Sequence, residues 1–373
     1  MWACGFKSHY PYYRVCGVTV AHEIWDFGEQ FDSDIFYQKR FWIISMNKIS
    51  VIIPAFNAEK TIHRTLASLI SNRDFIYEIQ LIDDHSTDRT IEIAKEFYDI
   101  LPQLSIWKSD GFHNPGLARK TGLDLAVGNY VTFLDADDCL TPSSLYYVDK
   151  QLDKNLILLH TKTMYYESGE FRSLIEYADN SCGGNFYRLD YLINNKLYPH
   201  ENLPLSEDEY FNDIVKKQLL LDNLQDKIEH FDYPVYEVHH DIEWGKSHAI
   251  ENWVEYCIRY HLLYKEYVAE RFKDTEINAK IQNEYCDNFI FCYFLYQALL
   301  LDEDLDNREV VHQMIYFQRA VRYFEQTFGN RCYIYDYYNR YSDFVSTLLD
   351  TAVSCTGINF NEYLFFDKFL ECL

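Results

Sequence analysis

Short apolar runs alternate, between residues 49 and 134, with segments in which apolar residues recur at helical spacing. The runs predict strands at 49–54, 76–82, 104–107 and 129–134. The intervening periodicity and the capping residues before it predict helices around Leu66 and at 91–97 and 116–127. Repeated strand–helix–strand units of this kind predict an α/β fold, with a mostly parallel sheet flanked by helices.

Polar clusters follow three of the predicted strands. Asn57 comes after the first strand, Asp83 and Asp84 end the second, and the acidic tetrad 135–138 (DADD) follows the fourth. In parallel sheets, ligands bind beyond the carboxyl ends of the strands. Three carboxylates within four residues repel one another unless a cation or hydrogen-bond donors offset them, and a hard divalent ion that holds substrate phosphates would do so. An acidic loop that caps the next helix is the structural alternative.

The pattern changes on both sides of this region. Residues 1–45 show no clear period and end just before Met46, so we expect an N-terminal extension there. From about residue 250, apolar residues recur at helical spacing with few Gly or Pro. We therefore expect three parts, 1–45, 46–248 and 249–373, with the α/β unit in the second and a helical C-terminal region in the third.

Composition limits the classes of partner. The 373-residue chain has a formal net charge of −24, so nucleic acid or a broadly anionic membrane would be repelled over most of its surface. Ten cysteines without a CxxC pair or regular spacing favour reduced structural thiols and a cytoplasmic location. The longest charge-free apolar stretch, 289–301, is too short to span a bilayer and indicates a core helix.

Four motifs, in this order along the chain, resemble those of the family 2 glycosyltransferases, which have the GT-A fold. The motifs are SVIIPAFN at 50–57, IDDHSTD at 82–88, GLAR at 116–119 and FLDADD at 133–138. Each is weak alone, but their order and spacing are typical of the family. The resemblance covers 49–150 well and 180–247 loosely, and it does not extend to 1–45 or 250–373.

The resemblance implies a nucleoside diphosphate sugar donor, and a UDP-linked one is expected. Asp84 would accept a hydrogen bond from the uracil ring, and Arg119 would approach the nucleotide or the diphosphate from near a helix start. The structural alternatives are a turn residue for Asp84, a helix N-cap for Asn57 and a surface arginine for Arg119. Four residues after the first strand would line the base and ribose: Pro54, Ala55, Phe56 and Asn57.

The same resemblance implies a divalent cation, Mn²⁺ or Mg²⁺. Asp137 would coordinate it directly, while Asp135 would contact the ribose or add a second metal contact. Asp138 could instead hold the loop. His239 falls where relatives have a loop that closes over the diphosphate, so it would complete the metal shell or contact phosphate. A solvent-exposed histidine pair with His240 is the alternative.

The segment 205–211 resembles the Glu-Asp segment in which family members place their general base. We assign this role to Asp208, which would take the proton from an acceptor hydroxyl as it attacks the anomeric carbon, with inversion. Acidic residues that merely favour a helix N-terminus are the alternative. Upstream, Gly183 and Gly184 fall where relatives carry an acceptor-side loop, although glycine pairs also simply make turns.

The resemblance thus implies a hexosyltransferase that acts on a glycan or lipid-linked acceptor in cell-surface polysaccharide or lipooligosaccharide synthesis. The C-terminal helices are expected to contact the inner face of the membrane peripherally or to form a homo-oligomer. A nucleotidyltransferase is disfavoured because segment 55–59 has no glycine, and a dehydrogenase because no GxGxxG follows the first strand. A non-catalytic nucleotide-sugar-binding or assembly protein on a degenerate GT-A scaffold remains the open alternative.

Overall fold

The computed structural model describes residues 47–281, apart from 110, 112–113, 153–154, 176–180, 204–205 and 241–252. The expected N-terminal extension 1–45 lies outside the described residues, as does most of the expected C-terminal region. The boundaries of these parts therefore stay predictions.

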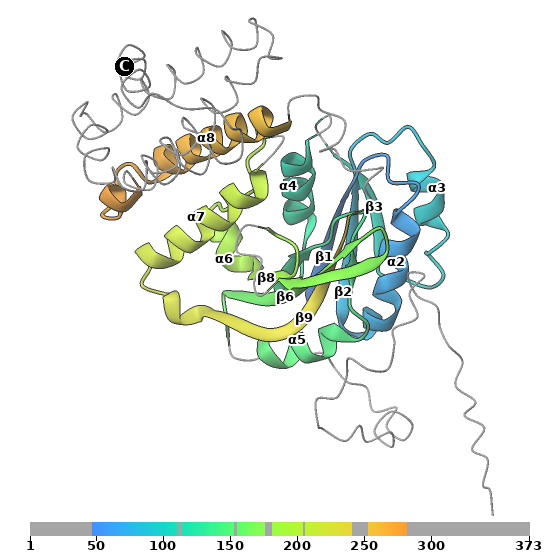
Figure 1. Cartoon of the computed structure of the whole chain (residues 1–373). Helices are drawn as coiled ribbons and strands as arrows, with labels where there is room; N and C mark the ends of the chain where they lie inside the picture. Colours follow the sequence, from blue (N-terminus) through green and yellow to red (C-terminus); the bar gives the residue numbers. More distant parts are fainter. Residues whose placement is uncertain are drawn as a thin grey trace, which may run out of the picture.

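One mixed sheet forms the centre of the described structure (Figure 1). Its strands lie in the order β3-β2-β1-β4-β8-β6-β9-β5, with β7 paired to β6. The strands are β1 Ile49–Ala55, β2 Ile76–Asp83, β3 Leu104–Lys108, β4 Tyr130–Phe133, β5 Cys139–Leu140, β6 Leu158–Glu167, β7 Glu170–Ile175, β8 Asn185–Arg188 and β9 Ile228–His240.

The strands β3, β2, β1 and β4 pair in parallel, as the strand–helix alternation predicts. Their carboxyl ends therefore share one edge of the sheet, and the polar clusters after β1, β2 and β4 meet there. Beyond β4 the sheet is mixed: β8 joins β4 in antiparallel orientation, and β6 pairs with β8 antiparallel and with β9 parallel. The strand order and pairing of this second half were not predicted, because its strands follow no regular alternation with helices.

Helices cover both faces of the sheet (Figure 1). One face carries α2 Ile62–Leu69, α3 Thr90–Lys95 and α5 Ser144–Leu152. The other carries α4 Pro115–Leu125, α6 Leu189–Asn194, α7 Glu207–Leu221 and α8 Trp253–Phe272. Two 3₁₀ helices complete the described elements, Ile70–Phe75 and Gln225–Lys227.

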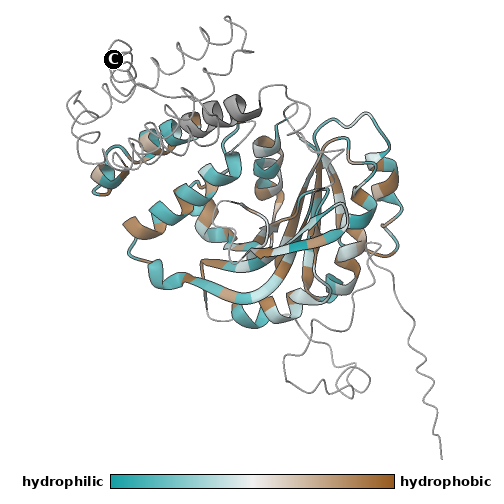
Figure 2. Cartoon of the chain, in the orientation of Figure 1, coloured by the Kyte–Doolittle hydropathy of each residue, from teal (hydrophilic) through white to brown (hydrophobic). Residues whose placement is uncertain are grey.

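Strand β1 shows why the apolar runs are continuous rather than alternating. Successive side chains of a strand point to opposite faces, so a strand with helices on both sides is apolar throughout. Val51 and Ile53 join the buried cluster beneath α2, α3 and α5, whereas Ile52 joins the cluster beneath α4, α6, α7 and α8. Figure 2 shows the corresponding hydrophobic residues along the central strands.

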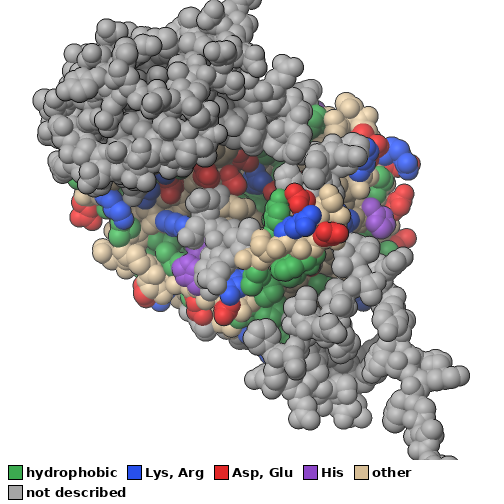
Figure 3. Space-filling view, viewed as in Figure 1, with side chains coloured by type: hydrophobic (Ala, Val, Ile, Leu, Met, Phe, Trp, Pro, Cys, Tyr) green, Lys and Arg blue, Asp and Glu red, His purple; other side chains and the backbone are tan. Residues whose placement is uncertain are grey.

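Among the described residues, no helix is both long and apolar enough to cross a bilayer. Acidic and basic side chains are interspersed over the described part of the face in Figure 3, which presents no broad basic area there.

Helix α8 packs into the same core as α7. Val268 and Phe272 are buried in the cluster that contains the apolar face of α7. At the rim of this contact, Lys265 Nζ donates a hydrogen bond to Asp213 of α7 at 2.8 Å. The first helix beyond the expected boundary at residue 248 is therefore part of the core of the described structure.

We expect Phe272→Ala to lower the free energy of unfolding by about 3–5 kcal/mol, because it empties a ring-sized space in this core. Phe272 is 2% exposed. Urea unfolding followed by circular dichroism measures the change. The control Lys273→Ala alters an exposed neighbour and should shift stability by less than about 0.5 kcal/mol. Equal effects of the two substitutions would show that α8 does not stabilise the core.

Candidate active site at the carboxyl edge of the sheet

The loops after β1 and β2 are tied together at the edge of the sheet. The backbone N–H of Asp84 donates to the carbonyl of Ala55 at 2.8 Å. The backbone N–H of Asn57 donates to Ser86 Oγ at 3.0 Å, and Asn57 Oδ1 accepts from the backbone N–H of Thr87 at 2.8 Å. Asn57 thus joins the two loops, in a left-handed conformation with φ 48° that asparagine tolerates.

The four residues expected to line a nucleotide base lie at the end of β1 and just beyond it. Ala55 is buried, Pro54 and Phe56 are half-buried, and Asn57 is exposed. Asn57 does not cap α2, whose N-cap is Thr61. Pro54, Phe56 and Asn57 are therefore at least partly accessible at the edge of the sheet where a ligand of a parallel sheet would bind.

Asp84 is buried directly after β2 and positions the start of α4. Its Oδ2 accepts from the backbone N–H of Asn114 at 2.5 Å. Asn114 caps α4, since its Oδ1 accepts from the backbone N–H of Leu117 at 3.0 Å and Pro115 follows it. The contact with a uracil ring that the resemblance implies for Asp84 stays a prediction.

Arg119 extends from α4 and joins two acidic residues that are far apart in the sequence. Its Nη2 donates to Asp135 Oδ1 at 2.6 Å, and its Nη1 donates to Glu207 Oε1. Only 6% of Arg119 is exposed, so it is not the surface arginine of the structural alternative. The two ion pairs connect the loop after β4 to the first turn of α7.

The acidic loop 135–138 divides its carboxylates between the interior and the surface. Asp138 is buried, and its oxygens accept from Tyr236 Oη at 2.7 Å and from the backbone N–H of His239 at 2.9 Å. Burial, followed by the charges of Asp137 and Asp135, raises the pKa of Asp138 well above its ordinary value. Asp138 therefore holds the loop, whereas the side chain of Asp137 is exposed and Asp135 is half-buried.

Tyr236 contacts the acidic loop, and the sequence did not predict this contact. Besides its bond to Asp138, its hydroxyl accepts from the backbone N–H of Asp135 at 3.1 Å. A Cβ atom on Gly183 would lie 2.6 Å from the Tyr236 ring, and Gly184 has φ +74°. The glycine pair thus allows close approach of the ring that orients the acidic loop. No motif around Tyr236 signals this contact.

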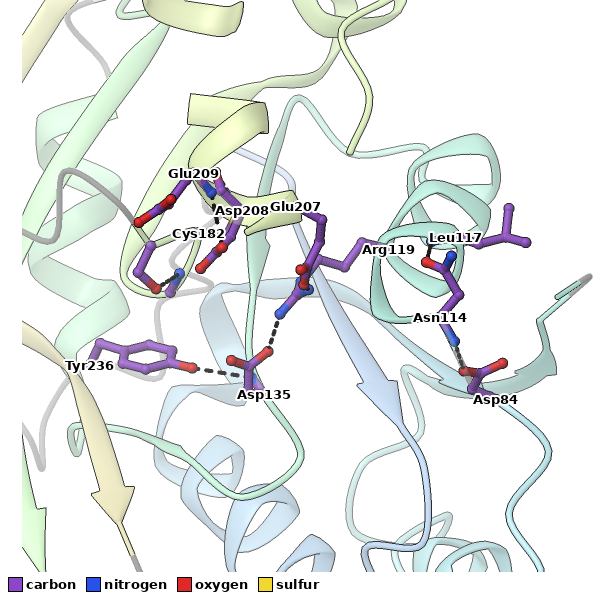
Figure 4. A network of polar contacts seen from close by, with 12 residues as sticks. Asp84, Asn114, Leu117, Arg119, Asp135, Cys182, Glu207, Asp208, Glu209 and Tyr236 are labelled. Atoms are coloured by element: carbon purple, nitrogen blue, oxygen red, sulfur yellow. Dashed lines mark hydrogen bonds and ion pairs between the residues drawn. The ribbon is translucent and has the colours of Figure 1, made fainter. Parts of the chain in front are cut away.

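Asp208 lies in the first turn of α7, beside Glu207. Figure 4 shows Asp208, Glu207, Arg119 and Asp135 gathered in one place, while Asp84 lies apart beside the start of α4. Asp208 is half-buried, and its Oδ1 accepts from the backbone N–H of Glu209 at 2.9 Å. Removal from water and the neighbouring Glu207 charge raise the pKa of Asp208 to about 8. The side chain is therefore a stronger base than an ordinary aspartate.

His239 is buried at the end of β9 rather than exposed to solvent. Its Nε2 lies 3.2 Å from Glu237 Oε2, and its ring stacks on Tyr166 with a centroid distance of 4.8 Å. The backbone of His239 reaches the acidic loop through Asp138, but its imidazole faces Glu237. Whether it ligates the cation expected at Asp137 stays a prediction.

Comparisons with known proteins find a family 2 glycosyltransferase domain in the chain. Residues 50–203 match the model of glycosyl transferase family 2. The chain is 27% identical over 293 residues to the poly(ribitol-phosphate) beta-N-acetylglucosaminyltransferase TarP of Staphylococcus aureus strain N315, which covers 74% of this chain and 80% of TarP. It is 29% identical over 126 residues to the Escherichia coli UDP-Glc:alpha-D-GlcNAc-diphosphoundecaprenol beta-1,3-glucosyltransferase WfaP, which covers 34% of this chain and 47% of WfaP.

A solved structure shows the same fold. The structure of S. aureus TarS 1–349 in complex with UDP matches with a TM-score of 0.58 and 20% identity, covering 84% of this chain and 93% of that one. The prediction of a GT-A fold from the four motifs is confirmed. The chain thus contains a glycosyl transferase family 2 domain at residues 50–203, with the GT-A fold, and its similarity to named glycosyltransferases indicates an enzyme.

Proposed function

We propose that this protein transfers a sugar from a UDP-linked donor to a glycan or lipid-linked acceptor, with inversion at the anomeric carbon. The observation that carries the proposal is the position of Asp208, on the first turn of α7 beside the ion pair of Arg119 and Asp135 (Figure 4). A carboxylate suited to accept a proton thus lies near the acidic motif that resembles the donor-binding carboxylates of the family.

In this reaction the Asp208 carboxylate takes the proton of an acceptor hydroxyl. The hydroxyl oxygen forms a bond to the anomeric carbon of the donor sugar while the bond to the diphosphate breaks on the opposite face, so the configuration inverts. General bases work best when their pKa lies near the working pH, and the pKa of Asp208 is raised to about 8. The ion pairs of Arg119 hold the base-bearing helix against the donor-side loop.

A divalent cation, Mn²⁺ or Mg²⁺, fits the acidic loop. Asp138 is hydrogen-bonded to Tyr236 and to the backbone of β9. The oxygen donors for the cation are therefore the exposed Asp137 and the Asp135 oxygen that does not pair with Arg119. Bound there, the cation would offset the negative charge that develops on the departing nucleoside diphosphate. His239 was expected to complete this shell, and its imidazole faces Glu237.

The names of the relatives support the donor and acceptor classes. TarP is a poly(ribitol-phosphate) beta-N-acetylglucosaminyltransferase, and WfaP uses UDP-Glc with a diphosphoundecaprenol-linked acceptor. We therefore favour a UDP-sugar donor and a polymer or lipid-linked acceptor in surface polysaccharide or lipooligosaccharide synthesis. Such an acceptor would place the enzyme in the cytoplasm, at the inner face of the membrane, with peripheral contact or a homo-oligomer formed through the C-terminal helices.

The direct test is a panel of UDP and GDP sugars with Mn²⁺, scored for release of nucleoside diphosphate with and without candidate acceptors. We expect release with a UDP sugar, stimulated by acceptor, and a product whose anomeric configuration by NMR is opposite to that of the donor. Retention of configuration would refute the single-displacement mechanism. Binding of UDP sugars without any release would favour the non-catalytic binding protein.

The pH dependence tests the environment of Asp208. Because the base acts only when ionised, we expect transfer to increase with pH, with a midpoint at about 8, and to level off roughly one pH unit above it. Glu207→Gln should move this midpoint to lower pH, since the Glu207 charge raises the pKa of Asp208. Initial rates at saturating donor between pH 5.5 and 9.5, roughly the range in which such a base titrates, measure the midpoint. Glu209→Gln is the matched control with a smaller expected shift; a midpoint that is the same in all three proteins would contradict the assignment.

A further inference from the structure

A second group of potential metal ligands lies where β5 pairs with β9. It consists of Cys139, Glu237 and His239, whose sulfur, carboxylate oxygen and imidazole nitrogen all lie within 4.8 Å of one another. We propose that these three residues bind a Zn²⁺-type cation, separate from the oxygen-ligated cation proposed at Asp135 and Asp137. The proposal goes beyond the transfer reaction and assigns His239 to this second site.

Backbone pairing brings the three side chains together. Cys139 and Glu237 are direct partners in the antiparallel β5–β9 ladder, which places their side chains next to each other on one face. His239 follows Glu237 by two residues on β9, and residues two apart on a strand share a face. Strand register therefore places the three side chains on one face of the sheet, next to one another.

The three side chains of the cluster are largely buried, as the ligands of a protein metal site commonly are. Cys139 is 1% and His239 6% exposed, and the Glu237 side chain is 14% exposed. A largely buried carboxylate needs a cation or hydrogen-bond donors. The basic side chain paired with Glu237 is His239, whose Nε2 lies 3.2 Å from Glu237 Oε2. The Tyr166 ring stacks on the imidazole at an interplanar angle of 7°, which fixes its orientation.

The ligand types indicate which ion would bind. Thiolate, imidazole and carboxylate are the three protein ligand types that Zn²⁺ takes, with bonds of about 2.0–2.3 Å. Tetrahedral ligands at those distances lie roughly 3.3–3.8 Å apart, close to the 3.2 Å between His239 Nε2 and Glu237 Oε2. Mg²⁺ prefers oxygen ligands and would not use the sulfur of Cys139. Three protein ligands leave a fourth position for water.

A simple His–Glu hydrogen bond beside a buried thiol is the alternative explanation of the same geometry. The two explanations differ in the chemistry of the sulfur. A metal site requires a thiolate bound to the ion, whereas the hydrogen-bond explanation leaves Cys139 as a protonated thiol whose sulfhydryl donates weakly to the Arg64 carbonyl at 3.9 Å. A spectroscopic signal from the sulfur–metal bond therefore separates them.

The experiment is a titration of the reduced, chelator-treated full chain with Co²⁺, which substitutes for Zn²⁺ and gives a thiolate-to-cobalt absorption in the near ultraviolet. We expect this absorption in the wild type and its loss on addition of Zn²⁺. It should be absent in Cys139→Ser, and in His239→Ala the Co²⁺ affinity should fall by more than the roughly 10–100-fold that loss of an outer-shell partner typically costs.

Two control variants make the test specific. Cys182→Ser removes the thiol of a different buried cysteine and should keep the absorption. Asp137→Asn disables the proposed donor cation site and should also keep it, whatever the transfer activity of that variant. Circular dichroism checks folding, and Glu237→Gln, with the same loss of affinity expected, replaces Cys139→Ser if the latter does not fold.

Several outcomes would overturn the proposal. No absorption in the wild type would mean that the cluster is a hydrogen-bonded pair beside a thiol. Full absorption in Cys139→Ser would place the cobalt on another cysteine of the chain. Loss of the absorption in Asp137→Asn would show one shared ion rather than a separate site. None of these results depends on whether the enzyme transfers a UDP-linked sugar.

Discussion

Asp208→Asn is expected to lower the rate of sugar transfer by about 10²–10⁴-fold while donor affinity stays within about twofold. The amide has the shape of the carboxylate and can still accept the backbone hydrogen bond from Glu209, but it cannot take a proton from the acceptor. Initial rates at saturating donor and acceptor measure the loss. Calorimetric titration with UDP in the presence of Mn²⁺ measures donor-side binding.

The Asn variant should fold, so the loss can be read as chemistry. The folded protein disfavours the charged form of Asp208, as its pKa near 8 shows, and the neutral amide avoids that cost. Glu209→Gln changes the adjacent acidic residue of the same helical turn and should keep most of the activity. Wild-type transfer by Asp208→Asn would remove Asp208 from the role of general base, and the adjacent Glu207 would become the next candidate.

Asp137→Ala should lower donor turnover by about 10³-fold or more, together with its dependence on Mn²⁺. A bound metal ion stabilises developing charge by several kcal/mol, and about 4 kcal/mol corresponds to roughly a 10³-fold change in rate. Asp137 is the exposed carboxylate of the acidic loop, whereas the Asp138 carboxylate is buried and hydrogen-bonded to Tyr236. Nucleoside diphosphate release over a range of Mn²⁺ concentrations measures both the rate and the metal dependence.

The matched control for this substitution is Asp74→Ala. Asp74 is an exposed carboxylate just before β2, at the opposite edge of the sheet, and its loss should leave turnover unchanged. Asp137→Ala should also keep wild-type stability, because its side chain is exposed. Retained Mn²⁺-dependent turnover in Asp137→Ala would place the cation elsewhere and disconnect the acidic loop from the donor.

The sequence by itself determined the parallel half of the sheet and the edge at which the site lies. The apolar runs that became β1 to β4 are short and separated by helical periodicity, so their type and direction follow from residues close in the chain. The position of Asp84 and of the acidic loop at the carboxyl ends follows from the same local pattern. The motifs then sufficed to predict the family.

Only the tertiary structure decided which of these residues act together. Arg119 pairs with Glu207, 88 residues away, and Tyr236 reaches the acidic loop across 98 residues to Asp138. The cluster of Cys139, Glu237 and His239 likewise depends on the register of β5 against β9. The periodicity of apolar residues indicates whether a residue is buried, but not which distant residue it contacts. Those contacts depend on strand register and helix packing, which are set by the packing of the whole core.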